Sequence, residues 1–346
     1  MNLAIVHALV AAALFGASTP LAKSLVGGLP PLLLAGLLYL GSGLGLTIAR
    51  LIRDRRWIPS GLGRSEWPWF LGAVLFGGVL GPAALMYGLA TTPGAVAALL
   101  LNLEAVLTAV LAWVVFRENA DRRIVLGMAA IVAGSVVLSW SGRADVATGW
   151  IGPLAVAAAC LCWAIDNNLT RKVSASDAML IASVKGLVAG GFNTALALFL
   201  GADWPAGEKV LLAMMVGLFG YGISLVSFVL ALRGLGTART GAYFSTAPFL
   251  GAAIAIVFFG ESTSAGFWMA AALMGFGVWL HLTEKHVHKH QHEPLDHTHE
   301  HVHDDHHQHE HAFDWYGKEP HTHAHHHSPL IHSHEHFPDI HHRHTH

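Results

Sequence analysis

Ten apolar stretches, each long enough to cross a bilayer, dominate residues 1–282 of the chain. They lie at roughly 2–22, 31–51, 68–90, 94–115, 122–140, 149–169, 178–200, 209–231, 239–259 and 263–282. A helix needs about 20 predominantly apolar residues to span the hydrocarbon core. Unbroken runs of this length lack the alternation of a membrane barrel, and a helix satisfies its own backbone groups. The sequence therefore predicts an all-α integral membrane protein with ten transmembrane helices.

Basic residues are distributed unevenly among the loops that join these stretches. If the N-terminus is cytoplasmic, fourteen Lys and Arg residues fall on the cytoplasmic side, and only Lys23, Arg143 and Lys209 fall on the other. Cytoplasmic loops of membrane proteins carry such an excess of Lys and Arg. We therefore expect a multi-pass protein of the plasma membrane, which is the inner membrane in a bacterium. Both termini should be cytoplasmic, with lipid surrounding the helices.

The two halves of the apolar region share short motifs at a constant spacing. The tripeptide LFG occurs at 75–77 and again at 218–220, which is a spacing of 143 residues. Each half contains five stretches, so the second half enters the membrane from the opposite side. The pattern predicts two inverted five-helix repeats, at 1–142 and 143–282, with a solute site between them near the bilayer midplane.

Two long segments resemble the signatures of the EamA-like family in the drug/metabolite transporter superfamily. They are TTPGAVAALLLNLEAVLTAVLAWVVFREN at 91–119 for the first repeat and ALRGLGTARTGAYFSTAPFLGAAIAIVFFGES at 231–262 for the second. The resemblance extends over residues 1–282. It implies ten helices in two inverted five-helix repeats, a central cavity, and transport of a small organic solute, most often export.

Three charged residues, Glu104, Asp166 and Lys185, fall inside the predicted spans. A charge at the centre of a membrane helix costs roughly 2.5–3.5 kcal/mol on insertion scales, so it requires a partner or a wet cavity. We therefore predict that these residues belong to a substrate or coupling-ion site. The polar residues expected to contribute to the same site are Asn102, Thr108, Asn167, Ser18 and Thr19.

A structural role remains open for several of these residues. Glu104 could form a buried ion pair with Lys185 that fixes the positions of two helices. Asp166 could instead lie near the cytoplasmic interface and pair with a basic residue there, while Lys185 could be the partner of Asp166, attract a substrate carboxylate, or snorkel toward water. Asn102 could join neighbouring helices by hydrogen bonds. Arg239 could act as a gate residue or as a positive-inside anchor.

Residues 283–346 have a very different composition from the preceding chain, because they contain 24 of the 26 histidines. Their low apolar content predicts a disordered cytoplasmic tail. Histidine binds Zn²⁺, Ni²⁺, Co²⁺ and Cu²⁺, and repeated His-x-His units can wrap such an ion in several ways. The candidate metal ligands are His286, His288, His290, His292, His297, His299, His301, His303, His306, His307, His309, His311, His321, His323, His325, His326 and His327.

Transport by a secondary carrier is the function that these features favour. The sequence contains no Walker loop, zinc-protease motif or nucleophile elbow, so we expect no enzyme, no required cofactor and no nucleic-acid partner. The first hypothesis is export of a small organic metabolite, with a tail that buffers or senses divalent metal ions and with a homodimer as one compatible assembly. The alternatives are a divalent-metal exporter for Ni, Co or Zn that is loaded through the tail, and a non-transporting membrane metal sensor.

Overall fold

The computed structural model describes most of the chain up to residue 283 and four short segments beyond it. The described residues are 3–55, 63–116, 122–141, 150–170, 173, 177–283, 287–291, 295–301, 321–327 and 331–335, with backbone alone at 112, 141, 232–234, 236–239, 242 and the four segments beyond 283. The chain divides into two compact units, Met1–Glu284 and Lys285–His346, which are considered separately.

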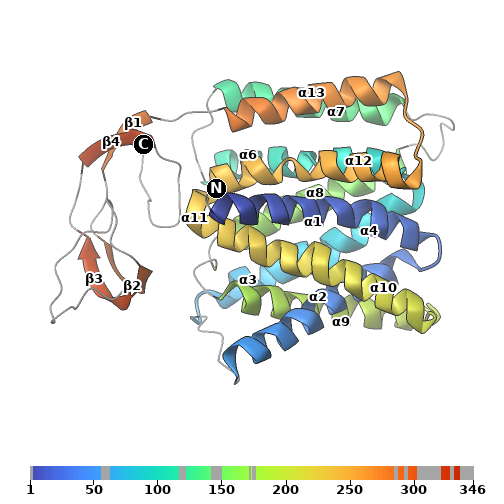
Figure 1. Ribbon diagram of the computed structural model, residues 1–346, viewed down its shortest axis with the longest axis horizontal. Coiled ribbons are helices and arrows are strands. Elements are labelled where there is room, and N and C mark those ends of the chain that lie inside the picture. The colour runs from blue at the N-terminus through green and yellow to red at the C-terminus, as the bar shows by residue number, and fades with distance from the viewer. Residues whose placement is uncertain are drawn as a thin grey trace. The chain divides into compact units, whose positions relative to one another are not determined.

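The described residues of the first unit form helices that lie side by side along a common direction (Figure 1). In chain order they are α1 Leu3–Val26, α2 Pro31–Asp54, α3 Trp67–Ala73, the π-helix η1 Val74–Leu80, α4 Gly81–Thr91, α5 Gly94–Leu100, α6 Leu103–Phe116, α7 Arg122–Ser141, α8 Ile151–Thr170, α9 Ala178–Phe199, α10 Gly207–Gly217, the π-helix η2 Leu218–Ile223, α11 Ser224–Phe244, α12 Ala247–Phe259 and α13 Ala265–Leu282.

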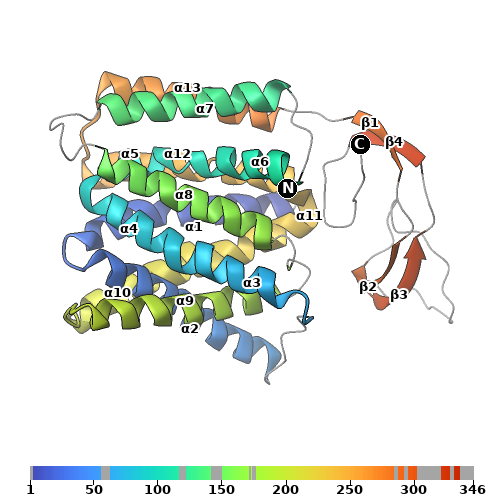
Figure 2. The same cartoon turned by 180° about the vertical axis from the view of Figure 1, so that it is seen from behind.

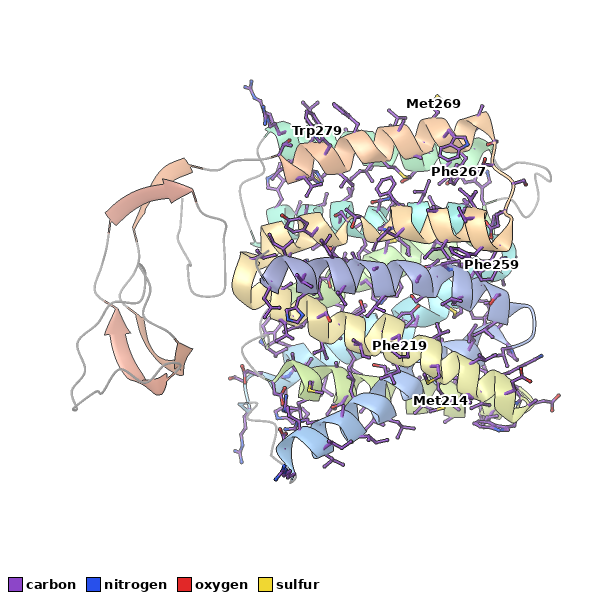
Figure 3. All side chains as sticks on the ribbon, in the orientation of Figure 1. Met214, Phe219, Phe259, Phe267, Met269 and Trp279 are labelled. Atoms are coloured by element: carbon purple, nitrogen blue, oxygen red, sulfur yellow. The ribbon has the colours of Figure 1, made fainter. Side chains whose placement is uncertain are left out.

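Eight helical segments among the described residues are long and apolar enough to cross a membrane. Their outward surfaces carry large apolar side chains, such as Met269 and Trp279 on α13, which are 54% and 55% exposed (Figure 3). An exposed apolar surface of this extent suits lipid rather than water. The predicted stretches at 149–169 and 239–259 correspond to α8 and to the 13-residue α12, which fall outside these eight segments, so the count of ten spans stays a prediction.

The fourth predicted span is interrupted, which corrects the uninterrupted helix expected at 94–115. α5 ends at Leu100 and α6 begins at Leu103, and the intervening turn is held by hydrogen bonds to residues three positions back. The Asn102 side chain also donates to the carbonyl of Leu99 at 3.0 Å. A side-chain amide that bonds to nearby backbone in this way competes with the regular helical pattern.

A second turn, at 245–246, separates α11 from α12 and lies at nearly the same place in the second half. Asn102 and Ser245 are 143 residues apart, which is the spacing of the LFG motif. The loop expected between 231 and 239 is not present, because the backbone of α11 remains helical through this segment. The segment contains no proline, so every residue keeps the backbone donor that a helix requires.

The two LFG motifs both fall in π-helical segments, η1 and η2. A π-turn displaces the usual helical hydrogen bonds and is frequent at functional sites. In η1 the carbonyl of Gly77 accepts two side-chain hydrogen bonds, from the Tyr39 hydroxyl at 2.7 Å and from Trp163 Nε1 at 3.0 Å. The sequence motif therefore marks a local change of helix geometry that ties three helical elements together.

Helices from the first half pack mainly against helices from the second half. α2 lies along α9, and α7 lies along α13 (Figure 2). Small residues permit the close approach of α2 and α9: a Cβ atom at Gly43 would meet the backbone of Gly186 at 2.6 Å. Small-residue interfaces of this kind are how membrane helices pack, because lipid offers no hydrophobic gain for burying larger side chains.

The second unit contains four short strands: β1 Val287–Gln291, β2 Leu295–His301, β3 His321–His327 and β4 Ile331–Glu335. β1 pairs antiparallel with β4, and β2 pairs antiparallel with β3. In the second ladder His297 lies opposite His325 and His299 lies opposite His323. The sequence predicts disorder for these four segments. The structure instead pairs them as antiparallel strands, whose backbone N–H and C=O groups form hydrogen bonds with each other.

Candidate solute-binding site

A cavity lies among the helices of the first unit. Its lining comes from α1, α2, α6, α8, α9, η2 and α11 and consists of Phe15, Tyr39, Glu104, Trp163, Asp166, Asn167, Lys185, Gly220, Tyr221, Ser224, Leu225, Phe228 and Phe244. The empty space amounts to ≈ 570 Å³, part of which is open to solvent. A concave space lined mainly by aromatic and apolar side chains, with a few polar groups among them, is typical of a site for a small molecule.

Glu104 reaches this cavity from the first turn of α6, directly after the interruption of the fourth span. One carboxylate oxygen accepts a hydrogen bond from Asn167 Nδ2 at 2.9 Å. The same amide nitrogen lies 3.4 Å from the Thr108 hydroxyl oxygen. Glu104, Asn167 and Thr108, which the sequence predicted as site residues, therefore meet at the contact between α6 and α8.

Asp166 and Lys185 form an ion pair on the cavity wall and link α8 to α9. Both side chains are less than 10% exposed, so Lys185 does not snorkel toward water. The second oxygen of Asp166 accepts a hydrogen bond from the Thr170 hydroxyl at 2.9 Å. Of the ion pairs considered from sequence, the structure contains the one between Asp166 and Lys185 and not the one between Glu104 and Lys185.

The absence of a side chain at Gly77 makes room for this ion pair. A Cβ atom at Gly77 would overlap the Asp166 carboxylate, and a Cβ atom at the adjacent Gly78 would lie 3.4 Å from the Lys185 side chain. Both glycines belong to η1. The π-turn and the buried charge pair are thus parts of one arrangement.

Aromatic rings form most of the rest of the cavity wall, and sequence reasoning did not predict them. Phe15 lies at the centre of the group, with ring centroids 5.9 Å from Trp163, 5.9 Å from Tyr221 and 5.3 Å from Phe244. Tyr39 lies 5.4 Å from Tyr221. A tyrosine within an apolar span requires a partner for its hydroxyl, so Tyr39 and Tyr221 could have been found by the argument applied to the charges.

The Tyr221 hydroxyl is buried beside the Ser18 hydroxyl, with which it interacts only weakly, and it forms no hydrogen bond of ordinary length with the described residues. The nearby Ser18 hydroxyl instead donates to the carbonyl of Phe15 at 2.6 Å. Buried polar groups are nearly always paired, so an orphaned hydroxyl calls for an explanation such as a bound water, ion or ligand. Tyr221 therefore adds an unused polar group to the cavity.

The other predicted site residues are not among those that line this cavity, or their side chains fall outside the described residues. Ser18 and Thr19 are buried in α1, each 1% exposed, and neither is part of the cavity lining. Asn102 is buried in the turn between α5 and α6. The side chain of Arg239 falls outside the described residues, so its expected role as gate or anchor stays a prediction.

Several of the predicted metal ligands lie on the described strands of the second unit. They are His288 and His290 in β1, His297, His299 and His301 in β2, and His321, His323, His325, His326 and His327 in β3. The others, His286, His292, His303, His306, His307, His309 and His311, lie outside the described residues. The side chains that the structure describes contain no group of three or more His, Cys, Asp or Glu residues suited to a metal ion.

Similarity to known proteins establishes the family. The EamA-like transporter family matches the chain over residues 2–140 and 150–283. The chain belongs to the EamA-like transporter family. The two matched ranges of this EamA-like protein coincide with the two halves identified from its repeated motifs. It is accordingly a multi-pass membrane transporter of the drug/metabolite type.

One curated relative of this EamA-like protein agrees with that assignment, and one solved structure shares the fold. An uncharacterized transporter of Methanothermobacter thermautotrophicus is 27% identical over 267 residues, which cover 72% of this chain and 77% of the relative. A protein of known crystal structure is 23% identical, with a TM-score of 0.62, and the match covers 81% of this chain and 98% of the other. The second similarity supports the fold alone.

Proposed function

We propose that this protein exports a small organic metabolite by alternating access and that the cavity around Glu104 is its solute-binding site. The observation that carries the proposal is the gathering of Glu104, Asn167 and the Asp166–Lys185 pair around one cavity within the helical unit. Ionisable groups within membrane helices are costly and mark substrate or ion pathways. An interrupted helix beside such a site is also typical of secondary transporters.

The alternating mechanism would use two inverted five-helix repeats, with ten transmembrane helices in all. Matching interruptions at Asn102 and Ser245, and matching π-turns at η1 and η2, support this arrangement. The proposed orientation has both termini in the cytoplasm and the protein in the bacterial inner membrane, because basic residues are concentrated in the loops on that side.

Glu104 is the proposed coupling residue. A carboxylate that meets only a neutral amide can take up a proton without breaking an ion pair. Proton binding and solute binding at the same carboxylate would then compete, which is the requirement for exchange of one for the other. Asp166 suits this role less well, since Lys185 already neutralises its charge.

The histidine-rich segment is proposed to bind Zn²⁺, Ni²⁺, Co²⁺ or Cu²⁺ as an accessory that buffers or senses metal in the cytoplasm. Alternating histidines in β2 and β3 support the proposal, because His297 and His299 lie opposite His325 and His323. Neutral imidazole is a good ligand for all four ions. Organic export is favoured over metal export because the cavity offers Glu104 as its one carboxylate outside an ion pair among the described residues.

A paired metabolite and metal profile of cells tests this proposal. Cells that produce the full chain, a Glu104→Gln variant, a chain lacking residues 285–346, or no protein are compared for their internal organic solutes and metals. The account predicts that loss of the protein or of the Glu104 charge raises the internal level of an organic solute, while removal of the tail leaves that level unchanged. Accumulation of Ni, Co or Zn with no change in any organic solute would favour a metal exporter. No change in either would favour a sensor.

A further inference from the structure

We infer that the cavity selects organic cations, meaning a protonated amine carried on an aromatic or otherwise apolar body. The inference rests on the proposed function, because it names the substrate class for the same cavity. It follows from three features of the wall: the charge balance, the arrangement of the aromatic rings and the unused hydroxyl of Tyr221.

The fixed charges of the wall leave one carboxylate without a cation. Asp166 and Lys185 neutralise each other in a direct ion pair. Glu104 receives a hydrogen bond from the neutral amide of Asn167, and none of the ion pairs among the described residues includes it. An ionised Glu104 therefore gives the cavity a net negative charge, which a cationic solute would neutralise.

The aromatic rings supply the surface that an organic cation requires. Phe15 lies edge to face with both Trp163 and Tyr221, at interplanar angles of 76° and 77°. Because these neighbouring rings are nearly perpendicular, the aromatic group presents ring faces in some directions and ring edges in others. The face of an aromatic ring attracts an ammonium group, most strongly where water is excluded, and the same rings pack against an apolar body.

Tyr221 supplies a second polar contact for an ammonium group. Tyr221 lines the cavity, and its hydroxyl forms no hydrogen bond of ordinary length with the described residues, while the residue is only 7% exposed. A phenol oxygen can accept a hydrogen bond from an N–H group. An ammonium group has three N–H donors, which could be shared among Glu104, Tyr221 and a ring face or water.

Other solute classes fit these features less well. The carboxylate of an amino acid would need a cation, but Lys185 is already bound to Asp166. A divalent metal ion would need several oxygen or nitrogen ligands around one point, and here Glu104 and the Asn167 amide supply few. A neutral alcohol would leave the charge of Glu104 unmatched. An organic amine satisfies both the charge and the rings.

Three probes that share one phenylethyl body test the inference: phenethylamine, phenylalanine, which adds a carboxylate, and 2-phenylethanol, which replaces the amine by a hydroxyl. Their binding to the full-length protein in lipid nanodiscs is measured by calorimetry at neutral pH. Phenethylamine should bind at least about tenfold more tightly than either of the others, a difference of the size expected from one charge-assisted contact. Equal or tighter binding of phenylalanine would overturn the inference, and so would the absence of phenethylamine binding.

Variants at Glu104 make the test specific to this residue. Glu104→Gln should weaken phenethylamine binding about tenfold or more while leaving 2-phenylethanol binding unchanged, and Glu104→Asp should retain most of the amine preference. Size-exclusion profiles of both variants report whether they fold, and the Asp variant provides a second measurement if the Gln variant does not. An unchanged preference in a folded Glu104→Gln protein would contradict the inference.

These outcomes separate the substrate class from the proposed function. If the cell profiles show export of an organic solute that depends on Glu104 but phenethylamine does not bind, the substrate class is wrong and the transport function stands. If no organic solute changes in cells, the transport function itself fails, whatever binds in nanodiscs.

Discussion

The carboxylate of Glu261 accepts hydrogen bonds from the backbone N–H groups of Gly94 and Ala95, both at 2.8 Å. Glu261 follows α12 in the second half, and the two N–H groups begin α5 in the first half. The contact therefore joins the halves at the ends of two helices. A carboxylate at a helix N-terminus satisfies unpaired donors and interacts favourably with the helix dipole.

Removal of this contact should loosen the end of the bundle at which α5 begins. Glu261→Ala should destabilise the ordered start of α5 by ~1 kcal/mol, the usual scale of a lost helix cap. The population of conformers in which this end is open should then rise about fivefold. Hydrogen exchange of the Gly94 and Ala95 amides, measured by mass spectrometry, should accelerate. Glu208→Gln, a change to an exposed acid in the first turn of α10, serves as the control and should leave the exchange unchanged. Equal protection in both variants would show that the Glu261 contact does not hold this end.

Removal of one partner of the Asp166–Lys185 pair should destabilise the protein more than removal of both partners. Lys185→Met leaves Asp166 as a buried, unpaired charge, and the loss of one partner from such a pair costs about 3–5 kcal/mol. The double variant Asp166→Asn, Lys185→Met removes both charges and should regain most of this loss. Thermal unfolding in detergent measures the cycle. Independent, additive effects of the two substitutions would contradict a direct pair.

Glu104 should determine the response of transport to a pH gradient. In proteoliposomes, an imposed gradient should drive solute movement in the unaltered protein, because protons and solute compete for this carboxylate. Glu104→Gln cannot bind or release that proton, so its flux should no longer respond. Asp166 and Lys185 line the same cavity and could also bind or release protons. The double variant Asp166→Asn, Lys185→Met removes both of these groups and is the control for their contribution. A full response of solute flux to the pH gradient in Glu104→Gln vesicles would contradict proton coupling through this residue.

Asp177 should stabilise the start of α9 through both its charge and its capping hydrogen bond. Its carboxylate accepts from Met179 N–H at 3.0 Å and from Arg53 Nη2 at 2.6 Å. Burial acts to raise the pKa of Asp177, but hydrogen bonds from Arg53, Arg50 and the Met179 backbone outweigh it and hold the pKa below its usual value.

The lowered pKa fixes the pH range over which this charge contributes. A carboxyl with a lowered pKa in the folded state adds stability above its unfolded value of about 3.9 and loses it as the pH falls through the folded value. Asp177→Asn should therefore unfold at a lower temperature than the unaltered protein at pH 7, and the gap should close toward acid pH. Asp177→Ala also loses the cap, so it should be less stable than Asp177→Asn at both pH values. A gap that persists unchanged at low pH would contradict the role of the charge.

The sequence predicted the all-helical, membrane-spanning character of the first unit, because bilayer thickness sets a length that apolar runs must match, and the count of ten spans stays a prediction. It also indicated Glu104, Asp166 and Lys185 as charges within the spans, since charges are rare in such runs, and their role in transport stays a prediction. It could not decide which charges meet, because that depends on the packing of α6 against α8 and of both α8 and α9 against η1. Asn167 was expected in the site, but its contact with Glu104 follows only from that packing.

Hydrophobic periodicity also could not predict the interruption after Leu100 or the π-turn at Gly77. Both are local departures from a helix that the apolar pattern treats as continuous. The sequence did not predict the aromatic part of the cavity wall for a related reason. Phe15 and Trp163 look like ordinary apolar residues of a span until the fold brings them to within 5.9 Å of each other. In the tail, composition predicted disorder where the backbone pairs as β1 with β4 and β2 with β3.

Accessibility of the cavity from each face of the membrane tests the central claim most directly. Leu225, which lines the cavity, is replaced by cysteine in a protein whose two native cysteines, Cys160 and Cys162, are changed to alanine. A membrane-impermeant maleimide is then applied to right-side-out and to inverted vesicles. The account predicts labelling of Leu225→Cys from both faces, with phenethylamine slowing the reaction from either side. Labelling from neither face, or from one face alone under every condition, would contradict an alternately opened solute site.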